Sequence, residues 1–385
     1  MKSLKPYFKM SKNITYLDSA ALVLKPNSAI KANNNFYTKY SVSTRTSNAP
    51  LGIKNTQIIN NLRQKIALLL NTNLEQSSII FTSGTTQSLN IFAKMIQNNI
   101  TCDDEILISP YNHSSNFIPW IEVAKKTKAK LVVKENLLDY INPKTKIIAL
   151  SQVTNNFNIT HNLEQIFQKA QSVGAYVIND AAQAIIYENV SMLKSHIIAF
   201  SANKFYGPTG LGVLAINNDL LKRLQPVDFG GGSVINIDVN NNWTQIPTID
   251  LYEPGTINLA GIYMFNAAID FFNNYIGYKN TNKILKTLAN YAYKKLNTIN
   301  NIEIYSSVDD HIILFNIKGY DSHDIAHYLG QHNIYVRSGL FCAHYLRNIK
   351  NVNSYVRVSL GVYNTKNDIN KLVEALKKGG DFLVI

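Results

Sequence analysis

The chain has 385 residues, which is long enough for a large core domain and a smaller companion. Hydrophobic residues make up 46% of it and charged residues 16%, which excludes a disordered chain, and the lysines behind the net charge of +13 are too scattered to predict a nucleic-acid partner. No apolar run approaches the roughly 18 residues of a membrane span, and residues 1–10 lack an apolar block of signal-peptide length, so we expect a cytoplasmic protein with no membrane partner.

Short β-branched apolar runs alternate with helical patterns over most of the chain before Gly261. The apolar runs lie at 78–82, 105–109, 130–133, 146–153, 175–180, 196–201 and 211–216, and helical patterns lie between them at 85–97, 115–127 and 162–173. Such alternation builds a mostly parallel sheet with helices on both faces. We therefore predict an α/β fold whose large domain, residues 16–260, contains a seven-stranded, mostly parallel sheet.

The pattern changes after Gly261. Helical stretches at 262–275 and 280–297 are followed by strand-like runs at 311–317, 334–337 and 354–359, and helical patterns at 322–330 and 366–378 complete the region. These patterns predict a smaller C-terminal α+β domain over residues 261–385. We expect the N-terminal segment, residues 1–15, to pack near this domain.

Polar residues follow several of the predicted strands. In parallel α/β sheets, ligands bind beyond the carboxyl ends of the strands, which meet at one edge. The sequence therefore predicts a pocket at that edge, lined by Ser83 to Thr86, His113, Asn155, Asp180 with Gln183, and Ser201 to Lys204.

The stretch Gly84-Thr85-Thr86 lies between a predicted strand and a predicted helix. Backbone N–H groups at a helix N-terminus, together with two hydroxyls, would hold a phosphate well. An ordinary helix N-cap is the alternative interpretation.

Asp180 and Lys204 would complete a cofactor site beside that phosphate loop. A carboxylate at the end of a buried strand needs a partner, and a protonated pyridinium nitrogen would be one. Lys204 precedes a glycine-rich turn and is placed to form an imine with an aldehyde. By themselves, Asp180 could be a helix cap and Lys204 a solvated surface lysine. Their combination with the phosphate loop favours the cofactor site.

Two further residues suit such a site. His113 could stack on a cofactor ring and carry protons, although a loop histidine bonded to nearby backbone is the alternative. Arg357 lies inside an apolar strand pattern, where a guanidinium needs an anion. A substrate carboxylate would bind it through two hydrogen bonds, and a structural ion pair is the alternative.

The chain has only two cysteines, which is typical of a reducing compartment. Cys102 has no evident role. Cys342 follows Gly339, which permits a mobile loop, and Arg337 and His344 would favour its thiolate form. A lone cysteine is more often a small buried hydrophobe, but a loop of the second domain could bring Cys342 over the pocket of the first. No metal site is expected.

With this set of residues, the chain resembles the Suf-type cysteine desulfurases of the class V aminotransferase superfamily. Enzymes of this superfamily have the fold-type I architecture. The likeness covers nearly the whole chain. The turn after Lys204, Gly207-Pro-Thr-Gly210, is specific to the superfamily, and the pattern from Arg337 to Ala343 is specific to desulfurases. Other matching stretches are Tyr16 to Ala21, Phe81 to Thr86, Asn116 to Trp120, Asn179 to Gln183, Glu253 to Asn258 and Arg357 to Leu360.

The resemblance implies a role for each site residue in a pyridoxal 5'-phosphate enzyme. Lys204 forms the Schiff base and acts with Cys342, the sulfur acceptor, and with His113, which stacks on the ring. The other cofactor contacts are Asp180 at the ring nitrogen, Gln183 at the ring hydroxyl, and Thr85, Thr86 and Ser201 at the phosphate. Asn155 and Arg357 orient the substrate carboxylate, and Thr256 reaches the phosphate of the neighbouring subunit.

The implied reaction converts L-cysteine to L-alanine and leaves a persulfide on Cys342. The implied partners are a second copy of the chain in a homodimer and a sulfur-acceptor or iron–sulfur scaffold protein. Two alternatives stay open. One is another class V enzyme, either an aminotransferase or a selenocysteine lyase, and the other is a degenerate, non-catalytic scaffold for sulfur transfer.

The chain departs from the family pattern at three places. Asn203 replaces the usual histidine before the lysine, and Leu340 and Phe341 replace two histidines before the cysteine. The stretch Thr44 to Ile53 replaces an arginine-glycine-isoleucine-histidine stretch. These departures concern the rate and the choice of acceptor more than cofactor binding.

Overall fold

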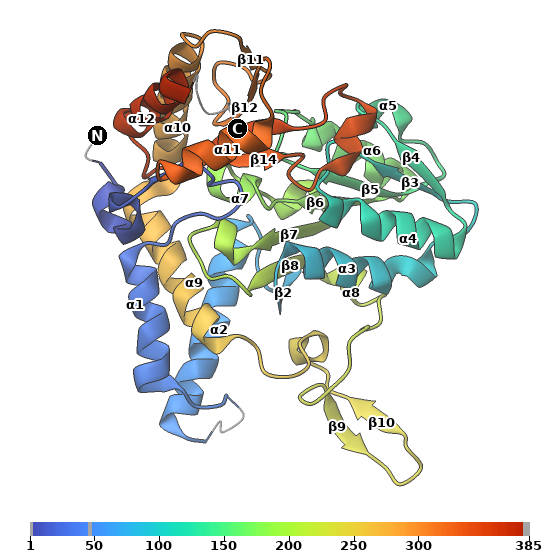
Figure 1. The fold of residues 1–385 in the computed structure, drawn as a ribbon. Coiled ribbons are helices and arrows are strands. Elements are labelled where there is room, and N and C mark those ends of the chain that lie inside the picture. The colour runs from blue at the N-terminus through green and yellow to red at the C-terminus, as the bar shows by residue number, and fades with distance from the viewer. Residues whose placement is uncertain (1–2, 45–47, 380–385) are drawn as a thin grey trace.

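The computed structural model describes residues 3–44 and 48–379, so residues 45–47 of the divergent Thr44–Ile53 stretch and the two ends of the chain lie outside it. Its central element is a seven-stranded sheet in the order β2-β8-β7-β6-β5-β3-β4 (Figure 1). The strands are β2 (Ser77–Thr82), β3 (Glu105–Ile108), β4 (Lys130–Val133), β5 (Thr145–Ser151), β6 (Tyr176–Asp180), β7 (Ile197–Ser201) and β8 (Gly212–Asn217). Each lies where the sequence predicted a strand.

Only β8 runs against its neighbours in this sheet. It is antiparallel to β2 and to β7, and the other adjacent pairs are parallel. The carboxyl ends of β2, β3, β5, β6 and β7 therefore meet at one edge, where β8 begins. The prediction of a mostly parallel sheet is confirmed.

Helices cover both faces of the sheet, as the apolar composition of its strands requires. In β3, Ile106 and Ile108 pack on one face with α3 (Thr85–Ile96), α4 (Ile118–Thr127) and α8 (Asn218–Leu221). Leu107 points to the other face, toward α5 (Leu137–Tyr140) and α6 (Leu163–Val173). Because successive strand residues point to opposite faces, continuous apolar runs fill both cores.

Three long helices lie to one side of the sheet (Figure 1). They are α1 (Asn27–Asn35), α2 (Pro50–Leu69) and α9 (Leu259–Phe271), and their buried side chains belong to one core together with those of β7 and β8. The sequence predicted most of α9, but it did not predict α1 or α2. Both are rich in asparagine, which weakens a helical pattern because Asn has low helix propensity.

A second, antiparallel sheet follows in the order β11-β12-β15-β14. Its strands are β11 (Ile302–Ile304), β12 (Ile312–Ile317), β14 (Arg337–Gly339) and β15 (Tyr355–Ser359), and its helices are α10 (Gly277–Leu296), α11 (Ser322–Gln331) and α12 (Lys366–Lys378). The strand predicted at 334–337 is divided, because β13 (Ile334–Tyr335) pairs with β1 (Thr15–Tyr16) instead. Lys5 forms an ion pair with Asp368 of α12, at 2.8 Å.

A hairpin of β9 (Val234–Ile237) and β10 (Trp243–Gln245) projects away from the rest of the chain (Figure 1). The sequence did not predict it. Apolar side chains on and around it are exposed, namely Phe229, Ile235, Ile237, Val239 and Trp243. Exposed apolar surfaces are common where proteins contact other molecules.

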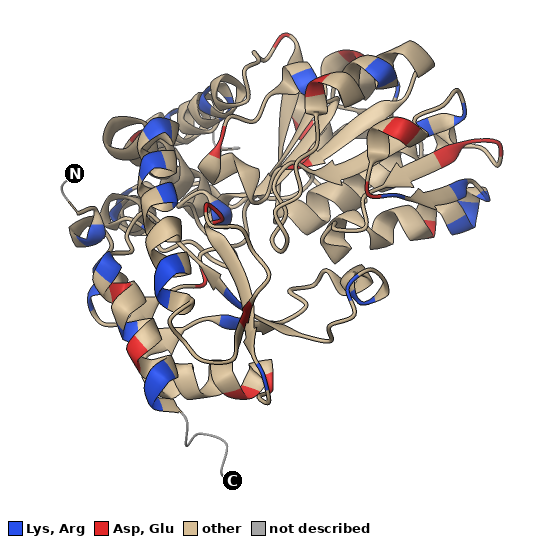
Figure 2. Cartoon of the chain, turned by 90° about the horizontal axis from the view of Figure 1, so that it is seen from above, with Lys and Arg blue, Asp and Glu red and all other residues tan. Residues whose placement is uncertain are grey.

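The basic residues do not form one surface. Figure 2 shows Lys and Arg spread over several helices and loops, with Asp and Glu between them. Within the described part of the chain, no helix combines the length and apolar composition that crossing a membrane requires.

Candidate active site

One pocket lies at the carboxyl edge of the seven-stranded sheet. Its lining comes from the start of α3 and from the loops after β3, β5, β6 and β7. The lining residues are Thr85, Thr86, His113, Ser115, Ser151, Val153, Asn155, Asp180, Ala182, Gln183, Ser201 and Lys204. Of the residues to which the family resemblance gave a role, Thr256, Cys342 and Arg357 lie outside this lining.

The start of α3 forms one end of the pocket. The Thr85 N–H donates to the Ser201 hydroxyl at 2.8 Å, and the two hydroxyls lie 2.8 Å apart. Gly212, the first residue of β8, passes so close that an added Cβ would lie 2.6 Å from the Gly84 nitrogen. Only glycine permits this approach, which brings backbone N–H groups and hydroxyls together at a helix N-terminus.

Lys204 reaches the pocket from the short helix after β7. Its Nζ donates to the carbonyl oxygen of Ala20. Burial lowers the pKa of the Lys204 amine to about 8, and the positive charge of Arg357 adds to this effect. A larger share of the amine is therefore neutral near pH 7 than in a surface lysine, and the neutral amine is the nucleophilic form.

Asp180 ends β6 with its carboxylate buried and 3% exposed. It accepts one hydrogen bond, from the Ala182 N–H at 3.1 Å. Burial raises the pKa of the Asp180 carboxyl to about 6, against the opposing effects of that hydrogen bond and of Lys204. A buried carboxylate with so few donors is well suited to a cationic N–H group.

His113 lies in the loop after β3, and its ring nitrogen Nδ1 accepts from the Ser115 N–H at 3.1 Å. Nδ1 therefore carries no proton, and Nε2 is the protonated nitrogen. Burial, together with the positive charges of Lys204 and Arg357, lowers the pKa of His113 to about 4. The ring is neutral near pH 7.

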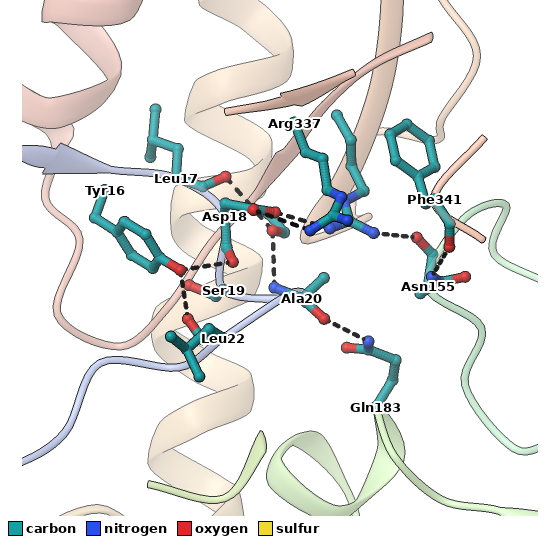
Figure 3. Close-up of polar contacts among 12 residues, drawn as sticks. Tyr16, Leu17, Asp18, Ser19, Ala20, Leu22, Asn155, Gln183, Arg337 and Phe341 are labelled. Atoms are coloured by element: carbon teal, nitrogen blue, oxygen red, sulfur yellow. Dashed lines mark hydrogen bonds and ion pairs between the residues drawn. The ribbon is translucent and has the colours of Figure 1, made fainter. Parts of the chain in front are cut away.

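The stretch around Ala20 contacts side chains of the pocket (Figure 3). The Gln183 side chain donates to the Ala20 carbonyl at 2.8 Å, the same oxygen that accepts from Lys204. Two pocket side chains are therefore fixed to one carbonyl far away in the sequence.

Arg357 comes from the middle of β15 and is only 1% exposed. One of its terminal nitrogens donates to Asp18 at 2.7 Å and the other to the Asn155 carbonyl at 3.0 Å. Its Nε has no partner among the described residues. Arg337 also faces Asp18, at 3.9 Å, so two guanidiniums share one carboxylate (Figure 3). This excess of positive charge beside Asn155 favours an incoming carboxylate.

The remaining predicted residues are exposed. Cys342 follows β14 and its carbonyl accepts hydrogen bonds from Ser114, next to His113. Thr256 lies outside the pocket, in a segment held by Glu253. Glu253 forms a buried ion pair with Arg63 at 2.6 Å and accepts from the Phe81 N–H of β2.

The family model of the class-V aminotransferases matches residues 15–372. The chain belongs to this family. A probable cysteine desulfurase of Ureaplasma parvum is 34% identical over 387 residues, which cover 97% of this chain and 95% of that protein. Another of Halalkalibacterium halodurans is 33% identical over 96% of this chain and 94% of that protein.

Solved structures of the family superpose closely on this fold. The cysteine desulfurase CsdA from Escherichia coli has a TM-score of 0.90 at 29% identity, over 99% of this chain and 98% of that one. An apo cysteine desulfurase from Thermococcus onnurineus has a TM-score of 0.91 at 26% identity, over 98% of both chains. The predicted family and the fold-type I architecture are confirmed.

Sequence reasoning missed several residues of this class-V aminotransferase site. Asp18 pairs with Arg357, Ser115 bonds both His113 and Thr86, and the Ala20 carbonyl binds two pocket side chains. Asp18 and Ala20 lie in a stretch that matched the family, but a motif match assigns no contact. Ser115 had no signal beyond its place two residues after His113.

The residues that depart from the family pattern lie in different surroundings. The Asn203 carbonyl accepts from Lys25 at 2.8 Å, and burial lowers the pKa of Lys25 to about 7, with the charge of Lys204 adding to this effect. Leu340 and Phe341 are buried. No group of three or more His, Cys, Asp or Glu side chains suited to a metal occurs among the residues that the structure describes.

Proposed function

We propose that this chain is a pyridoxal phosphate-dependent cysteine desulfurase that converts L-cysteine to L-alanine and carries the sulfur as a persulfide on Cys342. The curated relatives and the solved structures bear out the reaction class predicted from the sequence. The observation that carries the proposal is the single pocket in which Lys204 and Asp180 meet the hydroxyls at the start of α3.

The pocket residues fit the cofactor. Asp180 is a buried carboxylate with one backbone donor, which leaves acceptor positions for a protonated ring nitrogen. His113, neutral and beside the pocket, would lie against the ring, and Gln183 would contact the ring hydroxyl. The phosphate would be held by Thr85, Thr86 and Ser201. When bound, pyridoxal phosphate supplies an aldehyde for imine formation and a ring that withdraws electrons from the substrate.

Arg357 and Asn155 would bind the substrate carboxylate. The unpartnered Nε of Arg357 and the two guanidiniums around Asp18 leave positive charge for an anion to neutralise. An Arg–carboxylate pair also fixes the orientation of the substrate, because the guanidinium is planar.

Lys204 would move the protons. Its neutral amine, favoured by the lowered pKa, takes a proton from the substrate Cα and later returns one. Its hydrogen bond to the Ala20 carbonyl, which Gln183 shares, holds the amine at a fixed place in the pocket.

Cys342 would take the sulfur. Its deprotonated sulfur attacks the substrate sulfur, so an S–S bond forms as the substrate C–S bond breaks. The bonding electrons stay with the substrate carbon, which accepts a proton and becomes the methyl group of alanine. The products are alanine and a persulfide on Cys342, which passes to an acceptor such as an iron–sulfur scaffold protein in the cytoplasm.

The enzyme would work as a homodimer in which Thr256 reaches the phosphate of the neighbouring subunit. The exposed apolar hairpin around Ile237 and Val239 supports this assembly, because a second subunit would bury its apolar side chains. Sedimentation velocity should give a dimer for the wild type and a weaker one for Ile237→Asp. A monomeric wild type would refute the dimer.

The decisive experiment is incubation of the cofactor-loaded protein with L-cysteine. We expect alanine to form in step with a Cys342 peptide heavier by one sulfur atom, seen by mass spectrometry. Cys342→Ala should abolish both, whereas the control Cys102→Ala, at the other exposed cysteine, should change neither. Unchanged turnover in Cys342→Ala would reject the desulfurase function.

A further inference from the structure

Ser114 makes an unusual pair of contacts with the Cys342 loop. Its backbone N–H and its hydroxyl both donate to the Cys342 carbonyl, each at 2.7 Å, although the two residues are 228 positions apart. Two donors from one residue fix both the position and the tilt of that peptide group. Ser114 also directly follows His113, which lines the pocket.

The residue before Cys342 is also held by side-chain contacts. The Asn155 side chain donates to the Phe341 carbonyl at 2.7 Å, and the guanidinium carbon of Arg357 lies 4.6 Å from the centre of the Phe341 ring. Figure 3 shows Asn155 and Phe341 together. The proposed carboxylate-binding residues therefore also contact the cysteine loop.

The backbone of this loop is strained. Phe341 has a φ of 54° and Cys342 a φ of 58°, two successive left-handed residues that are not glycine. L-residues adopt this conformation at a cost in free energy, so the surrounding contacts must maintain it. As a result Leu340, Phe341 and Ala343 are buried while Cys342 alone is exposed.

We propose that Ser114 is a positioning residue for Cys342, acting through the Cys342 carbonyl to hold the strained loop and its thiol beside the pocket. This inference rests on the proposed function. Because Ser114 is adjacent to His113, it fixes the sulfur acceptor relative to the same loop that contacts the cofactor. Ser114 does not line the pocket and bonds the carbonyl of Cys342, so its loss should slow sulfur transfer without weakening cysteine binding.

Two variants remove the donors in steps. Ser114→Ala removes the hydroxyl only, and we expect kcat for alanine formation to fall about 2- to 10-fold, as for one hydrogen bond between neutral groups. Ser114→Pro removes both donors, and the extended backbone of His113, with ψ of 148°, accommodates a following proline. We expect kcat to fall about 10- to 100-fold, with KM for cysteine changed less than 3-fold in both variants.

A readout independent of turnover is hydrogen exchange of peptides spanning 337–346, followed by mass spectrometry on the cofactor-loaded enzyme. Exchange should be faster in Ser114→Ala and faster still in Ser114→Pro. Ser114→Thr, which keeps the hydroxyl, should restore both kcat and protection. The control Ser172→Ala, which removes a hydroxyl that donates to a backbone carbonyl in α6, should change neither.

Unchanged kcat and unchanged exchange in Ser114→Ala and Ser114→Pro would overturn this role for Ser114. If Ser114→Pro does not bind the cofactor, the test rests on kcat and hydrogen exchange in Ser114→Ala and Ser114→Thr. A wild type that forms no alanine and no persulfide would instead refute the proposed function, so the two failures are distinguishable.

Discussion

At the edge of the seven-stranded sheet, the pocket residues come from the end of a strand, from the loop after it or from the start of a helix. Arg357 instead comes from the second sheet, and Cys342 from the loop after β14. Asp180 and Lys204 take their places from neighbouring parallel strands, β6 and β7. Arg357 projects from the middle of β15 and is fixed by Asp18, 339 positions away. The pocket residues are therefore placed by the topology of neighbouring strands. Arg357 is placed by a contact with a distant segment.

Substitutions in the two regions should therefore have different effects. Substitutions in the pocket should alter chemistry or cofactor binding while the sheet persists. Substitutions in the second sheet should alter how substrate and sulfur acceptor are held. The variants below test that division.

Replacing Lys204 by Ala should have the largest effect. Without the Lys204 amine, the protein can no longer form its own imine with the cofactor or carry a proton from the substrate Cα, so we expect alanine formation to fall by about 10⁴-fold or more. Absorbance spectra and an alanine assay would measure this, with surface Lys222→Ala as the control. Activity within about 10-fold of the wild type would contradict the role of Lys204.

Replacing Glu253 by Gln tests the buried ion pair between Glu253 and Arg63. The change leaves the Arg63 guanidinium buried without its charge partner, so we expect unfolding free energy to fall by about 3–5 kcal/mol. Urea denaturation would measure it. The control Glu164→Gln breaks an exposed pair with Lys194 and should cost about 0–1 kcal/mol. Equal effects of the two changes would show that Arg63 is otherwise satisfied.

Replacing Arg357 by Lys tests the second sheet. Lysine keeps the charge but loses the planar pair of donors, so we expect KM for cysteine to rise about 10- to 100-fold with little loss of bound cofactor. Steady-state kinetics and cofactor absorbance would measure this, with exposed Arg347→Lys as the control. A normal KM would assign Arg357 a structural role with Asp18 only.

Replacing Asp180 by Asn should have the smallest effect on stability, and one that depends on pH. The folded pKa of Asp180 is raised to about 6 from 3.8, so its burial destabilises the cofactor-free protein increasingly between about pH 4 and 6 and by a constant amount above. We expect Asn to raise stability by about 3 kcal/mol at pH 8 and to give no gain near pH 4. Thermal unfolding at both pH values would measure it, with exposed Asp219→Asn as the control. A gain that is independent of pH would exclude ionisation of Asp180 as its cause.

Much of this architecture followed from the sequence. Alternating apolar runs gave the strands of the large sheet because a strand buried on both faces needs continuous β-branched residues. The position of a polar residue just after such a run placed Thr85, His113, Asp180 and Lys204 at one edge. The residues alone left two interpretations open for Cys342 and for Arg357, and the family resemblance implied a role for each.

Only the tertiary structure decided which distant groups meet. The pairing of Asp18 with Arg357, the shared Ala20 carbonyl and the two bonds from Ser114 to Cys342 join segments with no common periodicity. The sequence also did not predict the β9–β10 hairpin or the helices α1 and α2. Sequence patterns report which face of an element is apolar, whereas these contacts depend on how whole elements pack against each other, which no local pattern encodes.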